Sequence, residues 1–137
     1  MRTARKRYQY RFATRVFVRG IEEKSHVFLL SDFMDKGYEK TLQIAAKKHD
    51  LTGIRVYDPR EKSIPNIGLV PMQDSESGAV RWINTQSKAQ RLRYEKHFQQ
   101  LSQDFETIFK KNGAGTLSCS VEESYVKRLL GYFKARI

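Results

Sequence analysis

The stretch from His26 to Asp35 constrains the fold of this chain more than any other part of the sequence. It reads HVFLLSDFMD, an apolar run that ends abruptly at Ser31 and Asp32. Such a run is too short for a long helix and is typical of a parallel strand that is buried on both faces. In open α/β sheets, ligands bind at the carboxyl ends of the strands. The sequence therefore predicts a central strand over His26–Ser31, with the carboxylate of Asp32 at its functional end.

The charge of the chain is strongly positive and uneven. Its 137 residues, enough for one domain with a real core, carry 26 lysines and arginines against 15 aspartates and glutamates, a formal net charge of +11. Met1–Lys24 alone holds eight basic residues against two glutamates. We expect residues 1–11 to form a basic arm and residues 12–137 to form the domain. Such an arm can meet nucleic acid, an anionic membrane or an acidic partner, or it can be only a solvated face.

Several functional classes lack the residues that they need. Cys119 is the only cysteine, and His26, His49 and His97 do not have the spacing of metal ligands. The glycines form no phosphate-binding loop, and no serine lies in a nucleophile elbow. No apolar run approaches the roughly 20 residues of a membrane span, and the N-terminus has no signal-peptide pattern. We expect a cytoplasmic protein with no membrane span, and not an enzyme.

The remaining strand patterns predict an α/β fold of three layers. Parallel strands are expected over Leu51–Tyr57 and Thr116–Cys119, beside His26–Ser31. Turn-forming residues divide Ile67–Thr85 into two short strands, which predicts a β-hairpin insertion. Pro71 places the first of these strands at an edge, because proline cannot donate to a strand ladder.

Helical periodicity predicts the helices that flank these strands. The first segment is ambiguous, because Tyr8, Tyr10 and Phe12 alternate as in a strand, but we favour a helix there. The predicted helices are Arg11–Glu23, a helix capped by Asp35 and running to His49, a helix capped by Ser87 and running to Lys111, and a last helix that begins at a capping box of Ser120 and Glu123. Asn112 and Gly113 are expected to end the third of them.

Two aspartates follow successive predicted strands. If these strands are neighbours, Asp32 and Asp58 lie at one rim near Ser31 and Asp35, and their oxygens suit a hard cation such as Mg²⁺. Local structural roles are also open: Asp35 can cap a helix, Asp58 can begin a turn and Asp32 can accept a loop amide. A metal-dependent hydrolase that uses Asp32 and Asp58 is one hypothesis, although the chain has no recognisable general base for it.

Several blocks of the sequence resemble the C-terminal part of the bacterial family called domain of unknown function 58. They are Val27–Asp35 (VFLLSDFMD), Gly37–Asp50 (GYEKTLQIAAKKHD), Ile54–Glu61 (IRVYDPRE), Gly68–Val70 and Glu123–Leu130 (ESYVKRLL). The resemblance implies a Rossmann-like von Willebrand factor A fold, whose parallel sheet carries a metal-ion-dependent adhesion site. In such sites an Asp-Xaa-Ser-Xaa-Ser loop, a threonine and a later aspartate surround the cation, and Asp32 matches that last aspartate.

The chain departs from this family pattern in its first part. It contains no Asp-Xaa-Ser-Xaa-Ser sequence, and the first strands of the domain are not found. The resemblance therefore implies a partial domain: a fragment, a truncated gene product or a naturally short relative. Asp32 would be the remnant of a metal site, which predicts no cofactor or only weak Mg²⁺ binding. The strand beside the missing one would expose an edge formed by Val27, Phe28, Leu29 and Leu30.

These features favour a non-enzymatic protein-interaction module. We expect self-association through the exposed edge, and the resemblance implies a MoxR-type AAA+ ATPase as a partner in a chaperone-like assembly. The alternative is nucleic-acid binding through the basic arm of residues 1–11. Trp82 and the tyrosines are interleaved with basic residues but match no known RNA-binding signature, so we do not expect nucleic acid to be the main partner.

Overall fold

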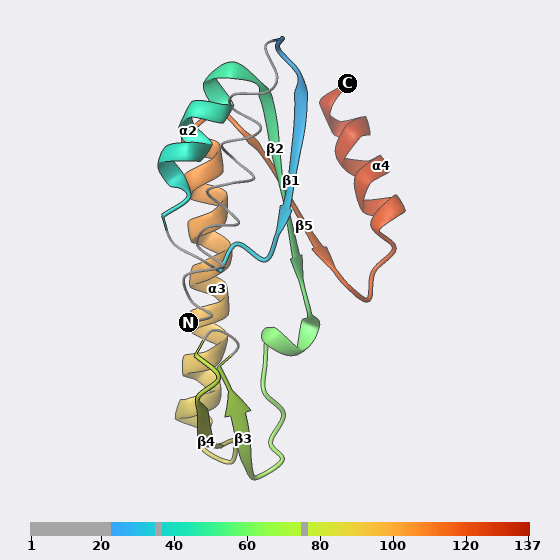
Figure 1. The fold of residues 1–137 in the computed structure, drawn as a ribbon. Coiled ribbons are helices and arrows are strands. Elements are labelled where there is room, and N and C mark those ends of the chain that lie inside the picture. The colour runs from blue at the N-terminus through green and yellow to red at the C-terminus, as the bar shows by residue number, and fades with distance from the viewer. Residues whose placement is uncertain (1–22, 35–36, 75–76) are drawn as a thin grey trace.

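The computed structural model describes residues 23–34, 37–74 and 77–137 of the chain (Figure 1). In chain order the elements are β1 (His26–Ser31), α2 (Glu39–Lys48), β2 (Asp50–Tyr57), the 3₁₀-helix η1 (Pro59–Glu61), β3 (Leu69–Gln73), β4 (Val80–Asn84), α3 (Lys88–Lys111), β5 (Gly115–Ser120) and α4 (Tyr125–Arg136). The predicted basic arm lies outside the described residues, as does all but the last residue of the predicted helix over Arg11–Glu23.

The larger sheet is parallel, and its strand order is β1-β2-β5. The register places Ser31 beside Arg55 in one pair of strands and Tyr57 beside Ser120 in the other. All three predicted parallel strands are confirmed to within one residue at each end. However, β2 rather than β1 is the central strand of the described sheet, so the prediction of a central strand over His26–Ser31 is wrong. An apolar run resembles a central strand in sequence, whereas only the pairing decides which strand lies at the edge.

Helices cover both faces of this sheet, which gives the predicted mixed α/β architecture. Figure 1 shows α2 and α3 on one face and α4 on the other. Because successive side chains of a strand point to opposite faces, Val27 and Leu29 join the core under α2 and α3. Phe28 points the other way, and its ring centroid lies 5.8 Å from that of Phe133 in α4. One face of β1 therefore packs under α2 and α3, and its other face contacts α4.

The core between the sheet and α3 is aromatic. Phe105 and Phe109 are completely buried, and their ring centroids are 4.8 Å apart. Phe33, which follows β1, stacks on Phe105 with ring centroids 4.7 Å apart. Gly53 of β2 lies directly beneath Phe109, and a β-carbon there would be 2.3 Å from the nearest ring carbon. This close approach explains a glycine in the middle of the central strand.

The start of α2 differs from the prediction. The helix begins at Glu39, and its N-cap residue, Tyr38, makes no side-chain capping bond. Gly37 has a φ of +95°, a left-handed conformation that no α-helical residue adopts. The prediction of a helix that begins directly after a cap at Asp35 is therefore wrong, and Asp35 itself lies outside the described residues.

The start of α4 also differs, because the predicted capping box does not form. Ser120 Oγ accepts the backbone N–H of Glu122 at 3.2 Å and so stabilises a turn that precedes the helix. The carboxylate of Glu123 accepts a hydrogen bond from Arg128 Nε at 2.8 Å and is not available to cap a backbone amide. The helix consequently begins at Tyr125, and the prediction that it begins at Ser120 and Glu123 is wrong.

Two predictions with strong local signals are confirmed. Ser87 Oγ accepts the amide of Gln90 at 3.4 Å, and α3 runs to Lys111, shortly before Gly113 turns the chain with a φ of +72°. The antiparallel hairpin of β3 and β4 also forms.

None of the helices in the described ranges has both the length and the apolar character that a bilayer crossing requires.

Candidate functional site

Asp32 lies directly after β1, at the carboxyl end of the parallel sheet. Its Oδ1 accepts hydrogen bonds from Ser31 Oγ at 3.4 Å and from the backbone N–H of Met34 at 3.3 Å. Phe33 between them has a φ of +51°, which is unusual for a bulky residue and directs its ring into the aromatic core. The carboxylate therefore stabilises a tight loop, which is the local structural role that the sequence left open for it.

Asp58 lies at the same rim, because it follows the neighbouring strand β2. Its Oδ1 accepts the backbone N–H of Arg60 at 2.9 Å and so caps η1. Burial raises the pKa of Glu61 on η1; the nearby Arg55 guanidinium opposes this rise, and the negative charges of Asp58 and Asp32 add to it. The three carboxylates thus act electrostatically on one another at the carboxyl end of the sheet.

Arg55 is the residue of this rim that sequence reasoning missed. It lies in β2 and is 2% exposed. Its Nε donates to the backbone carbonyl of Asp32 at 3.3 Å, and its Nη1 donates to Ser102 Oγ. The guanidinium carbon lies 4.7 Å from the ring centroid of Phe98, a cation–π contact. The sequence did contain a sign of this role, because Arg55 is the single charged residue within the predicted strand Leu51–Tyr57. A charged side chain in a buried strand needs specific partners.

The rim does not assemble a metal site among the residues that the structure describes. In those ranges no three His, Cys, Asp or Glu side chains lie close enough to hold one ion. Asp58 caps a helix, and the Arg55 guanidinium places a positive charge beneath Asp32, which opposes a divalent cation electrostatically. The other candidate ligand, Asp35, is outside the described residues. The carboxylates of Asp32 and Asp58 instead stabilise the turns that follow β1 and β2.

The predicted strand edge divides its side chains between two faces. Within the described residues β1 pairs only with β2, so along residues 27–30 its other edge has no neighbouring strand in those ranges. Val27 is buried and Leu29 is half-buried beneath the helices. Phe28 and Leu30 point to the other face, where they are 39% and 66% exposed. An edge of this kind can pair with a further strand.

The exposed apolar side chains of β1 continue onto α4. Phe133 makes an edge-to-face contact with Phe28, and Val126 and Leu130 lie on the same side of the helix as Phe133 by their spacing. Both aliphatic side chains are about half exposed. We call these five residues the β1–α4 surface: Phe28, Leu30, Val126, Leu130 and Phe133.

Polar contacts hold α4 against the sheet. Arg136 Nη2 donates to the carboxylate of Asp50 at 3.1 Å, and its Nη1 donates to Tyr132 Oη at 3.0 Å. Tyr132 Oη lies 3.0 Å from Thr52 Oγ1, and His26 Nδ1 lies 2.8 Å from Asp50 Oδ2. The hydrogen bond from Arg136 is the main reason why the pKa of Asp50 falls below its usual range. Asp50 therefore links α4 to the start of β2.

Replacing Asp50 with asparagine should reduce stability in a pH-dependent way. At pH 7 we expect a loss of about 0.2–1 kcal/mol in the free energy of unfolding, the range for partly exposed ion pairs. The pKa of Asp50 is lowered in the folded state, so its contribution is present above the unfolded value, near pH 4, and disappears as the pH falls through the folded value. Urea unfolding of both proteins over this range measures the difference, and a difference that does not change with pH would contradict the prediction.

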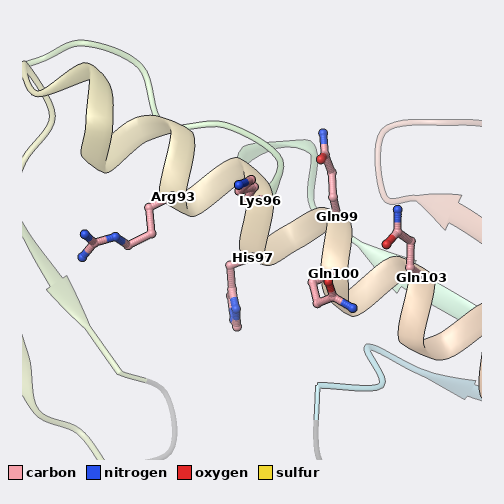
Figure 2. A pocket seen from close by; sticks show the side chains of 6 residues that line it. All are labelled: Arg93, Lys96, His97, Gln99, Gln100 and Gln103. Atoms are coloured by element: carbon pink, nitrogen blue, oxygen red, sulfur yellow. The ribbon is translucent and has the colours of Figure 1, made fainter.

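A shallow hollow of about 460 Å³ lies along α3 (Figure 2). The described side chains that line it are Arg93, Lys96, His97, Gln99, Gln100 and Gln103. Figure 2 shows Arg93 and His97 on one side of the helix and Gln99 and Gln103 on the other. None of the six is a carboxylate, so this part of α3 offers cations and amides to a ligand. Of these six residues the sequence analysis considered only His97 as a candidate ligand, and it found no metal-ligand spacing there.

The fold and its rim define a mixed α/β protein with a parallel sheet and a carboxylate-bearing carboxyl end. The chain belongs to the family described as protein of unknown function DUF58, which matches residues 4–104.

Similar proteins occur in mycobacteria. The chain is 39% identical to the uncharacterized protein Rv1480 of Mycobacterium tuberculosis (strain ATCC 25618 / H37Rv) over 54 residues, which are 39% of this chain and 17% of that protein. It is 26% identical to the uncharacterized protein MAV169 of Mycobacterium avium over 109 residues, which are 79% of this chain and 64% of that protein. The chain therefore spans less than two thirds of these relatives. No solved structure is significantly similar to it.

Proposed function

We propose that this chain is a non-enzymatic protein-interaction module that binds another polypeptide through the β1–α4 surface. One observation carries the proposal: Phe28 and Leu30 are exposed on an edge strand, and Phe133 joins them to the apolar side of α4. Contiguous exposed apolar side chains are typical of interaction sites. An edge strand adds main-chain hydrogen bonds to such a site. The rim of Asp32 and Asp58 has no catalytic part in this proposal, which needs no bound metal.

A second copy of the chain fits this edge. If two β1 strands pair in an antiparallel manner about Leu29, Phe28 of one copy lies opposite Leu30 of the other on the exposed face. The same register brings Asp32 of one copy towards His26 of the other. The contact is the same on both copies, as in most two-fold dimers. Self-association therefore covers both the edge and the apolar side chains.

The family resemblance refines this proposal. We infer a partial von Willebrand factor A-like domain in which Asp32 takes the position of the last aspartate of a metal-ion-dependent adhesion site. The place of Asp32 directly after a parallel strand supports this inference. In such a domain β1 would lie beside the first strand, so the edge is where the sheet would continue. The resemblance also favours a cytoplasmic chaperone-like assembly with a MoxR-type ATPase.

Replacing Leu30 with lysine should weaken self-association. A lysine on an edge strand places a charge where the second strand would pack, and we expect the dissociation constant to rise about tenfold or more. Sedimentation equilibrium over a range of concentrations at moderate salt measures the change. Ile44→Lys is the matched control, because Ile44 is also exposed but lies on α2, on the opposite face of the sheet. A wild-type chain that stays monomeric at the highest concentration, or an equal effect of both variants, would refute this role of the edge.

A further inference from the structure

The hairpin of β3 and β4 has an apolar face that the proposed function does not use. In its register Pro71 of β3 lies opposite Trp82 of β4. Leu69 precedes Pro71 by two residues and Val80 precedes Trp82 by two, so all four side chains lie on the same face of the hairpin. Trp82 is 66% exposed, and Leu69 and Val80 are also more than half exposed. Ile83 lies on the opposite face and is half-buried. Three large apolar side chains of this hairpin, Leu69, Val80 and Trp82, therefore lie on its solvent side.

Positive charge lies beside this apolar face. Residues 77–103 contain five lysines and arginines and one glutamate. Arg91 Nη1 donates to the carbonyl of Thr85 at 2.6 Å, which ties the first turns of α3 to the end of β4. Figure 1 accordingly shows the hairpin at the N-terminal end of α3. Arg93 and Lys96 of α3 are exposed and make no ion pair with any residue in the described ranges.

We propose that these residues bind an acidic amphipathic helix of a partner protein. The Trp82 surface, as we call it, consists of Leu69, Pro71, Val80 and Trp82 on the hairpin with the cations Arg93 and Lys96 on α3. Its charge selects a partner segment that carries carboxylates, and its apolar face selects large apolar side chains on that same segment. Tryptophan and arginine are the residues that most often dominate binding energy at protein interfaces.

The shape and composition of the surface favour a helix over the other anionic partners. The apolar side chains lie on the face of the hairpin, so they suit a partner that packs on this face rather than a strand added to its edge. A helix is about 10 Å wide, and two paired strands about 5 Å apart offer a platform of comparable width. Single-stranded nucleic acid would stack on Trp82, but it would leave Leu69 and Val80 without a function. The hollow lies on α3, whose first turns Arg91 ties to the end of β4, and its arginine, lysine and glutamine donors can bind carboxylates.

Trp82 itself provides the measurement, because it is the only tryptophan in the chain. The probe is a synthetic helical peptide of about five turns that contains no tryptophan and has a leucine and phenylalanine stripe flanked by glutamates. On titration we expect the emission of Trp82 to move to shorter wavelength as the indole leaves water. We expect the affinity to fall as the salt concentration rises, because screening weakens the attraction between the cations and the glutamates.

Variants distinguish binding at the Trp82 surface from nonspecific attraction of the peptide to the net positive charge of the chain. With a fluorescein-labelled peptide, Trp82→Ala should weaken binding about 30-fold or more, as a central tryptophan does at protein interfaces. The double variant Arg93→Glu/Lys96→Glu should weaken it about tenfold or more. The control Lys40→Glu/Lys47→Glu changes the net charge equally on α2 and should have a much smaller effect. Circular dichroism verifies that each variant is folded.

Three results would overturn the proposal. The first is no shift of the Trp82 emission at a peptide concentration of about 1 mM, the weak limit of specific binding. The second is an equal loss of affinity in the α2 control, which would assign binding to net charge alone. The third is tight binding of oligodeoxythymidylate, lost in Trp82→Ala, without binding of the peptide, which would make the surface a nucleic-acid site.

Discussion

Replacing Phe109 with alanine should lower the free energy of unfolding by about 3–5 kcal/mol, the range for the loss of a buried aromatic side chain. The ring of Phe109 is 0% exposed and contacts the rings of Phe33 and Phe105. Its other neighbour is Gly53, which has no side chain that could fill the cavity. The cavity would therefore persist between α3 and the central strand. Urea unfolding followed by circular dichroism measures the loss.

Leu92 provides the control for this experiment, because it lies on the same helix and is about half exposed. Its replacement by alanine should change the free energy of unfolding by no more than about 0.5 kcal/mol, as is usual for surface substitutions. A loss below roughly 1 kcal/mol in Phe109→Ala would mean that α3 does not pack on the sheet as described.

Replacing Gly53 with alanine should cost about 1–3 kcal/mol, the range for overpacking a well-filled core. The new β-carbon would lie 2.3 Å from the nearest carbon of the Phe109 ring, and two further ring carbons are within 2.8 Å. The ring cannot rotate away easily, because Phe33 and Phe105 hold it on other sides. Either the ring or strand β2 must therefore move, and the parallel ladders on both sides of β2 resist that movement.

Gly131 on α4 is the matched glycine control. A β-carbon built there meets nothing within 4 Å. Gly131→Ala should therefore stabilise the protein by about 0.5–1 kcal/mol through helix propensity. A second test combines Gly53→Ala with Phe109→Leu, because leucine lacks the outer ring atoms. If steric overlap is the cause, the double variant loses less than the sum of the two single losses, whereas additive losses would exclude it.

The two proposed surfaces lie on different elements, so their tests are independent. The β1–α4 surface belongs to the edge of the parallel sheet and to the C-terminal helix, and the Trp82 surface belongs to the separate two-stranded sheet. A second copy bound at β1 would leave the hairpin free for an acidic helix. Leu30→Lys should consequently weaken self-association and leave the response of Trp82 to the peptide unchanged.

The sequence by itself determined the features that depend on local chemistry. The apolar run of β1, the cap at Ser87 and the stop at Gly113 each act within a few residues, and each was predicted correctly. The turn-rich break in Ile67–Thr85 likewise predicted the hairpin. The sequence also placed Asp32 and Asp58 at one rim, because parallel neighbours end on the same side of a sheet.

Only the tertiary structure decided which of these features is buried, exposed or paired. Strand periodicity is the same for an edge and a central strand, so only the structure showed that Leu30 points to the face that α4 covers and stays 66% exposed there. The sequence did not reveal the role of Arg55, because its partners Ser102 and Phe98 lie on α3, far from Arg55 along the chain although in contact with it. Both faces of the hairpin carry apolar residues, and only the structure showed that Trp82 lies on the exposed face and Ile83 on the half-buried face. Local preferences fix the elements of a fold, whereas its surfaces depend on contacts between residues far apart in the chain.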